Sequence, residues 1–190
     1  MTPAWAEARL ALGGALRLAR GDPRGLAAFN PTEAGFWHSF RAAALCYPLY
    51  LILLSFPLQI GDVGEVDSWR LVAVETIHYV ISWVAFPLLM LPLVDWLRRS
   101  ERYFLFMVAY NWCQVPQTAA FAAVALAGAA GLLPADGVLI ADLIVGIAAL
   151  VYEWYVSRVA LAVSGSRAAL VILVDVILAT VLSHVSAALY

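Results

Sequence analysis

Four ionisable residues in strongly apolar segments have side chains that bind transition metals. Glu75 and His78 are three residues apart, so on a helix they share one face. With Asp142 and His184 they supply two imidazoles and two carboxylates, which are ligands for a divalent metal such as Zn²⁺. We expect all four near the outer membrane boundary. There the sequence favours headgroup contacts or hydrogen bonds between helices, with a metal site or proton relay as the alternative.

A polar stripe follows one helical face of residues 103–126. Asn111, Gln114 and Gln117 recur at intervals of three, and Thr118 continues the same face. Unsatisfied polar groups are costly in lipid, so the stripe must face a partner helix or water. Hydrogen bonds between helices are the favoured interpretation, and a water-lined path or binding cavity is the alternative.

One carboxylate lies deep within an expected span. Asp175 is about seven residues into the segment 168–189, on the order of 10 Å from its end at about 1.5 Å per residue. A carboxylate at this depth needs a partner, and we predict a structural ion pair, with a functional protonation site as the alternative. Glu153 is expected near the cytoplasmic boundary, among aromatic residues typical of an interface. The candidate partners of Asp175 are Arg41, Arg158, Asn111 and Gln114.

The segments that carry these residues are too apolar for a soluble domain. Of 190 residues, 64% are hydrophobic and 13% charged, against about half and a quarter in soluble proteins. Mean hydropathy is +0.88. The composition predicts an all-α fold, a polytopic transmembrane helix bundle (residues 31–190) preceded by a cytoplasmic segment (residues 1–30). Five spans are expected, at residues 40–58, 69–93, 103–126, 138–159 and 168–189.

The segment before the first expected span is predicted to form an amphipathic helix. Trp5 lies on its apolar arc, and Arg9, Arg17 and Arg20 lie on the polar one. Such a helix lies flat in the headgroup zone and is attracted to anionic lipid. The alternative is that it packs on the cytoplasmic face of the protein itself.

The distribution of arginine gives the orientation. With the N-terminus inside, ten of the eleven Arg residues fall in cytoplasmic segments and only Arg70 falls outside. We therefore expect a multi-pass protein of the bacterial inner membrane, with a cytoplasmic N-terminus and a periplasmic C-terminus. Nothing in the charge pattern indicates a nucleic-acid partner. Cys46 and Cys113 both fall in spans and are expected to behave as small hydrophobes.

Three stretches, residues 29–40, 102–114 and 152–158, are similar as a set to a group of small inner-membrane proteins of alphaproteobacteria. No activity is attached to that group. The plan of five spans with a cytoplasmic N-terminal segment is also similar to that of the Ypt-interacting-protein family of membrane-trafficking and membrane-shaping proteins. The motif in the first spans of that family is not present here, so this resemblance concerns architecture only.

No nucleotide-binding, serine-hydrolase or zinc-protease motif occurs in the chain, and no cofactor is assigned. The sequence therefore favours a non-enzymatic scaffold, accessory subunit or membrane-organising factor that binds a second copy or another membrane protein. A small transporter or channel using Asn111, Gln114, Gln117 and Asp175 is the first alternative. A membrane-embedded metal site is the second.

Overall fold

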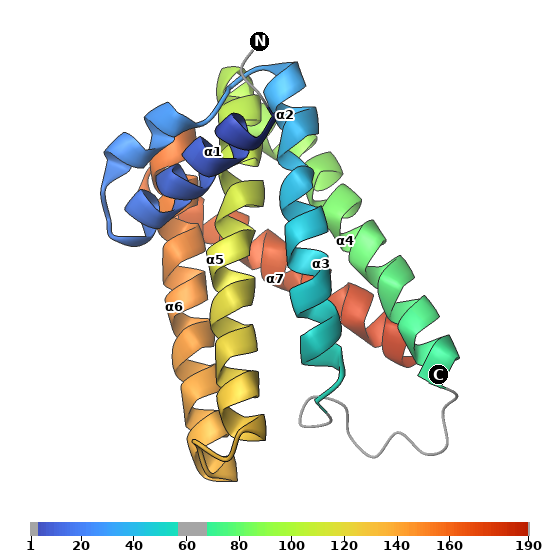
Figure 1. The fold of residues 1–190 in the computed structure, drawn as a ribbon. Coiled ribbons are helices and arrows are strands. Elements are labelled where there is room, and N and C mark those ends of the chain that lie inside the picture. The colour runs from blue at the N-terminus through green and yellow to red at the C-terminus, as the bar shows by residue number, and fades with distance from the viewer. Residues whose placement is uncertain (1–3, 57–67, 190) are drawn as a thin grey trace.

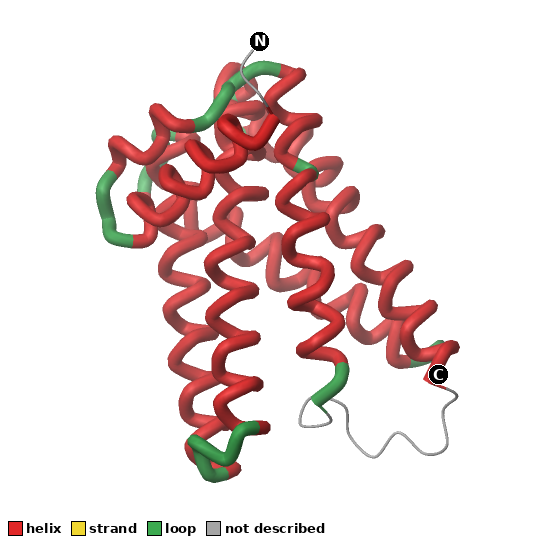
Figure 2. Tube along the Cα trace, in the orientation of Figure 1, coloured by secondary structure: helices red, strands yellow, loops and turns green. Residues whose placement is uncertain are grey.

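The computed structural model describes residues 4–56 and 68–189, which form helices joined by loops and turns, with no strand (Figures 1 and 2). The last residues of the first expected span, 57–58, lie outside this part. The elements in order are α1 (Ala4–Ala19), η1 (Pro23–Ala28), α2 (Glu33–Ser39), α3 (Arg41–Leu54), α4 (Ser68–Trp96), η3 (Ser100–Arg102), α5 (Tyr103–Ala129), α6 (Ala135–Leu161) and α7 (Gly165–Ala187).

Local sequence signals set several of these boundaries. The Thr32 hydroxyl accepts a hydrogen bond from the Gly35 amide at 3.1 Å and caps α2, as its residue type favours. Ser164 caps α7 through the Arg167 amide. Helix α6 ends at Ala162, whose φ of 50° lies in the left-handed region. The break after α1 falls at Gly21, which has a φ of 77°.

Helix α5 is the central element of the bundle. It packs against α6 and α3 along its length, and against α1 and α2 at the end where it begins (Figure 1). Phe106, Met107 and Ala109 on α5 are fully buried. Helices α4 and α7 pack on each other, and the Arg70 guanidinium at the start of α4 donates to the Leu189 carbonyl at 2.7 Å. The middle of the molecule is therefore bounded by five helices: α3, α4, α5, α6 and α7.

Three helices are long and apolar enough to cross a membrane: Trp69–Trp96 of α4, Ala135–Leu161 of α6 and Gly165–Ala187 of α7. Most of the large apolar side chains that the bundle leaves exposed belong to these three helices. The prediction of five spans is not supported on this measure. Helix α3 has 14 residues, and α5, with 27, carries the amides of the polar stripe on an otherwise apolar helix.

The apolar face of α1 packs on the protein. Ala8, Ala11, Ala15 and Leu18 are buried, and the Tyr152 hydroxyl of α6 donates to the Ala15 carbonyl at 2.7 Å. This packing is the alternative that the sequence left open for the helix, and the small alanine side chains allow the close approach to α5 and α6. Trp5, at 81% exposed, and the three arginines Arg9, Arg17 and Arg20 remain on the outer surface, and their contact with lipid stays a prediction.

Candidate functional site

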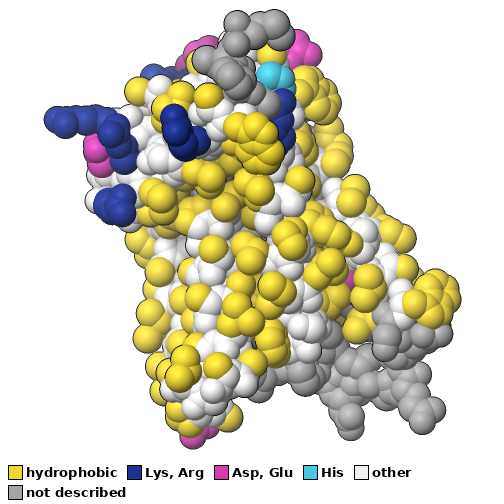
Figure 3. All heavy atoms as spheres, viewed as in Figure 1, with side chains coloured by type: hydrophobic (Ala, Val, Ile, Leu, Met, Phe, Trp, Pro, Cys, Tyr) yellow, Lys and Arg dark blue, Asp and Glu magenta, His cyan; other side chains and the backbone are white. Residues whose placement is uncertain are grey.

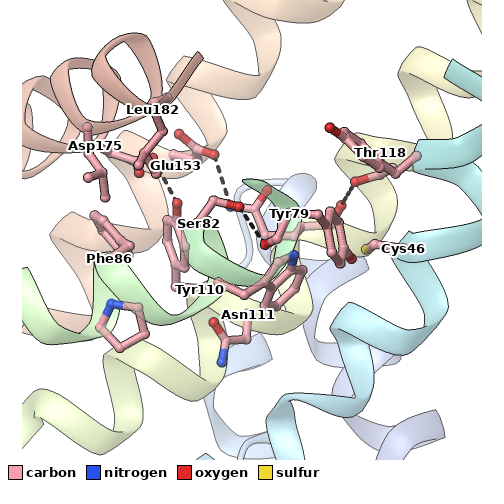
Figure 4. Close-up of a pocket in the computed structure, with 16 residues that line it drawn as sticks. Cys46, Tyr79, Ser82, Phe86, Tyr110, Asn111, Thr118, Glu153, Asp175 and Leu182 are labelled. Carbon is pink, nitrogen blue, oxygen red and sulfur yellow. Dashed lines mark hydrogen bonds between the residues drawn. The ribbon is translucent and has the colours of Figure 1, made fainter. Parts of the chain in front are cut away.

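A cavity of about 350 Å³ lies where α3, α4, α5, α6 and α7 converge (Figure 4). Asn111 and Gln114 of the polar stripe line it, as does Asp175 of α7. Glu153 of α6 joins them. Part of the polar stripe therefore lines a cavity, and the binding of a ligand there stays a prediction.

Asp175 is held by a tyrosine and not by an arginine. The Tyr110 hydroxyl donates to Asp175 Oδ2 at 2.8 Å, and the Tyr110 ring stacks on Phe86 with centroids 4.3 Å apart. The two arginine candidates are engaged elsewhere: Arg158 lies 5.5 Å from the centre of the Trp154 ring, and Arg41 lies 3.6 Å from the Glu7 carboxylate. Among residues 4–56 and 68–189 no ion pair includes Asp175, so the predicted ion pair is wrong.

Glu153 belongs to the same cavity, contrary to its expected place at the membrane boundary. It is 8% exposed, accepts a hydrogen bond from Gln114 Nε2 at 3.3 Å, and its carboxyl group interacts with that of Asp175. It lies eight residues before the end of α6, or about 12 Å at 1.5 Å per residue, and that spacing was the signal for a deeper position. The neighbouring tyrosines suggested an aromatic belt, but the Tyr152 and Tyr155 hydroxyls donate to α1 and to the Gly21 carbonyl beyond its end.

The other stripe residues have separate contacts. Asn111, 1% exposed, donates through Nδ2 to the Ser39 hydroxyl at 2.8 Å and so joins α5 to α2. Gln117 donates to the Cys113 carbonyl of its own helix and does not line the central cavity. The Thr118 hydroxyl donates a hydrogen bond to the Gln114 carbonyl, one turn earlier on the same helix, at 2.9 Å. The favoured interpretation, bonds between helices, therefore holds for Asn111 and for Gln114.

A second cavity lies along α5 and α6, with a volume of about 530 Å³. Gln114, Thr118 and Glu153 line both cavities, and Gln117 and Asp142 line only the second of these two. The hydrogen bond from Gln114 to Glu153 therefore lies in the wall between them. No feature of the sequence indicated that two cavities meet at this pair.

The four candidate metal ligands do not form a metal site. Glu75 accepts a hydrogen bond from the Tyr50 hydroxyl and lies 3.3 Å from His78 Nδ1, whereas His184 Nδ1 lies 2.8 Å from the Thr180 carbonyl of its own helix. Asp142 lines the second cavity. Within the described part of the chain no three His, Cys, Asp or Glu residues are grouped as metal ligands. The expectation was wrong because the position of a residue along its helix gives its level in the bundle, but does not show whether its side chain faces the other candidate ligands.

The Glu75–His78 pair instead joins three helices. Ser186 of α7 lies 3.3 Å from His78 Nδ1, and Tyr50 of α3 donates to Glu75. Serine and glutamate both approach the same imidazole nitrogen, whereas a catalytic triad uses the two nitrogens separately. The arrangement is a hydrogen-bonded contact between helices, which is the interpretation that the sequence favoured.

Comparison with protein-family models, with curated proteins and with solved structures finds no match for this chain. The resemblance to alphaproteobacterial inner-membrane proteins therefore stays a prediction. The geometry of the central cavity is the observation from which a function can be inferred.

Proposed function

We propose that the protein is a small integral membrane transporter or channel that holds its solute in the central cavity. The observation that supports this proposal is the convergence of Asp175, Glu153 and Gln114, from three helices, on one cavity. Carboxyl groups within membrane helices are costly and characteristically serve a pathway for ions or solutes. Two of them at one cavity, with neither in an ion pair among the described residues, are difficult to explain by helix packing alone.

The proposed topology keeps five helices in the bilayer. Helices α4, α6 and α7 present apolar faces outward, and α3 and α5 pack between them, so their polar side chains can face the cavity without facing lipid. Arginine side chains gather at the end that carries α1 (Figure 3). By the positive-inside rule, this end lies in the cytoplasm of a bacterial inner membrane, and the C-terminus is periplasmic.

Exposed tryptophans support the proposed membrane position. Trp5, Trp37 and Trp96 lie near the arginine-rich end and are each more than half exposed, at 81%, 63% and 69%. Trp69, also 69% exposed, lies at the opposite end of α4. Tryptophan is enriched at both membrane–water interfaces, so these side chains mark the two boundaries. Trp5 with Arg9, Arg17 and Arg20 then contacts anionic lipid.

The two cavities suggest a route for the solute. Asp142, which lines the second cavity, lies seven residues into α6, counted from Ala135, and therefore nearer the periplasmic end than Glu153 does. A solute entering past Asp142 would meet the Gln114–Glu153 hydrogen bond before it reaches Asp175. We propose that this bond is the barrier between the two halves of the route.

Solute flux into proteoliposomes tests the proposal. Swelling after a solute gradient is applied, followed by light scattering, reports any permeant member of a panel of alkali chlorides, ammonium-type chlorides and neutral polyols. We expect at least one solute to enter faster than into empty liposomes, and Asp175→Asn to change that rate. Asp136→Asn, at an exposed position in the first turn of α6, is the matched control. Equal rates for empty, wild-type and Asp175→Asn liposomes contradict the proposal.

The second candidate is a scaffold, accessory subunit or membrane-organising factor that binds a second copy or another membrane protein. The outward face of α6 favours it, with Leu139, Leu143, Ile147 and Leu150 exposed along one side. A stable partner interface on this side would shield these residues from lipid. Size measurement in mild detergent discriminates, since a strictly monomeric protein that captures no partner contradicts this candidate.

A further inference from the structure

Aromatic rings form much of the wall of the central cavity. Trp83 and Tyr79 of α4 have ring centroids 5.9 Å apart, and Tyr50 of α3 lies 4.9 Å from Tyr79. On the side of Asp175, Phe86 and Tyr110 stack at 4.3 Å. The faces of such rings carry negative electrostatic potential and attract cations, with indole the strongest.

The acidic groups at the cavity have no basic counterpart among the described residues there. Glu153 and Asp175 line it, and none of its described lining residues is Arg, Lys or His. Neither carboxyl group is part of an ion pair in the described ranges. A site with this composition attracts a cation and disfavours an anion.

The size and polarity of the cavity favour an organic cation over a bare metal ion. A volume of about 350 Å³ lies within the range of small-molecule sites, and its mixture of apolar walls and a few polar groups is typical of them. A dehydrated metal ion needs several oxygen ligands at close range. Aromatic faces cannot supply such ligands, but they contact alkyl groups on nitrogen well.

We propose that the central cavity binds a substituted ammonium group, with the aromatic wall around its alkyl substituents and Asp175 and Glu153 opposite its charge. This inference rests on the proposed function and names its substrate class. The ammonium group can belong to a free solute or to the headgroup of a membrane lipid. Both share the chemistry that the cavity recognises.

Calorimetric titration with choline tests the inference. The full-length protein is placed in nanodiscs of phosphatidylglycerol, a lipid that has no amine. The control ligand is dimethylbutanol, in which a carbon replaces the nitrogen of choline and removes its charge. We expect saturable choline binding and at least about tenfold weaker binding of the neutral analogue, as cation–π attraction and a carboxylate together provide. No choline binding, or equal binding of both ligands, overturns the inference.

Two pairs of variants locate the binding. Trp83→Leu removes a ring from the wall and Asp175→Asn removes a charge, and each is expected to weaken choline binding by about tenfold. Trp37→Leu and Asp136→Asn make the same changes at exposed positions outside the cavity and leave the affinity unchanged. Trp83→Phe keeps an aromatic face and gives an intermediate affinity, which separates lost recognition from lost folding. Wild-type affinity in both cavity variants contradicts the inference.

The source of the ammonium group is identified by one further titration. Phosphatidylethanolamine in the nanodiscs competes with choline if a lipid headgroup occupies the cavity, and leaves choline affinity unchanged if the ligand is a free solute. Either result supports ammonium recognition, because both require that choline itself binds.

Failure of this inference differs from failure of the proposed function. If choline does not bind but the flux of another solute depends on Asp175, the substrate class is wrong and the transport proposal stands. If choline binds through Trp83 and Asp175 but no solute crosses, the cavity is a binding site without transport.

Discussion

The buried hydrogen bond between Asn111 and Ser39 gives the most specific stability prediction. Asn111→Leu keeps a side chain branched at Cγ but removes the Nδ2 donor that lies 2.8 Å from the Ser39 hydroxyl. Both residues are almost fully buried, at 1% and 0% exposed. Because this bond joins α5 to α2, the substitution weakens the packing of the bundle.

The magnitude depends on the bonds that each partner keeps. Ser39 still donates to the Phe36 carbonyl at 2.6 Å after Asn111→Leu, so the expected cost is that of one hydrogen bond, about 0.5–1.5 kcal/mol. Ser39→Ala removes both of these bonds and leaves a buried amide donor without its partner. Its expected cost is therefore higher, about 1–3 kcal/mol for the unsatisfied group.

Thermal unfolding in detergent, followed by circular dichroism, measures both effects. For a chain of this size about 1 kcal/mol corresponds to a melting temperature lower by roughly 2–4 °C. The double variant should be more stable than the sum of the two single losses predicts, with a coupling of about 1 kcal/mol. Additive losses, or a larger loss for Asn111→Leu than for Ser39→Ala, would refute the reasoning from this contact.

Three other results are expected. Gly14→Val should separate η1 from α1 and speed proteolysis at the turn, because even a Cβ at Gly14 would lie 2.7 Å from the Gly25 carbonyl oxygen; unchanged proteolysis argues against this tight contact. Elemental analysis of purified protein should find no stoichiometric zinc, and zinc that is lost in His78→Ala would restore the metal hypothesis. Tyr110→Phe removes the hydroxyl that donates to Asp175 and should change the rate of solute flux. Its melting temperature should fall only by the amount that the loss of one hydrogen bond causes, and a flux equal to that of the wild type would exclude a role for this donor.

The helices could be predicted well from the sequence, since their boundaries depend on local signals. Apolar run lengths placed α4, α6 and α7 within a few residues, and a residue such as Thr32 is of a type that favours a helix cap. The number of spans is harder to predict, because it depends on what surrounds each helix. Helix α5 is apolar at both ends but polar in the middle. Its central position in the bundle, where other helices surround it, explains how these polar side chains are tolerated.

The candidate site was predicted in part. The period of the stripe placed Asn111 and Gln114 on one face, and the depth of Asp175 marked it as unusual, but neither identifies a partner on another helix. Tyr110 precedes the stripe by one residue and points to Asp175 only because α5 and α7 meet at that level. Glu153 was expected at the interface because its aromatic neighbours are typical of one. The hydroxyls of Tyr152 and Tyr155 instead donate to the Ala15 and Gly21 carbonyls, partners more than 130 positions away that the local sequence does not reveal.

Water access to the cavity tests the central claim most directly. Hydroxyl radicals generated by a brief X-ray pulse oxidise tryptophans that contact water, and mass spectrometry of protein in nanodiscs locates the oxidised residues. Trp83 lines the cavity, whereas Trp112, 3% exposed on α5, packs in the core and does not line it. Trp96, 69% exposed at the end of α4, is the positive control. A hydrated intramembrane cavity predicts that Trp83 is oxidised much faster than Trp112, and equal protection of the two would contradict it.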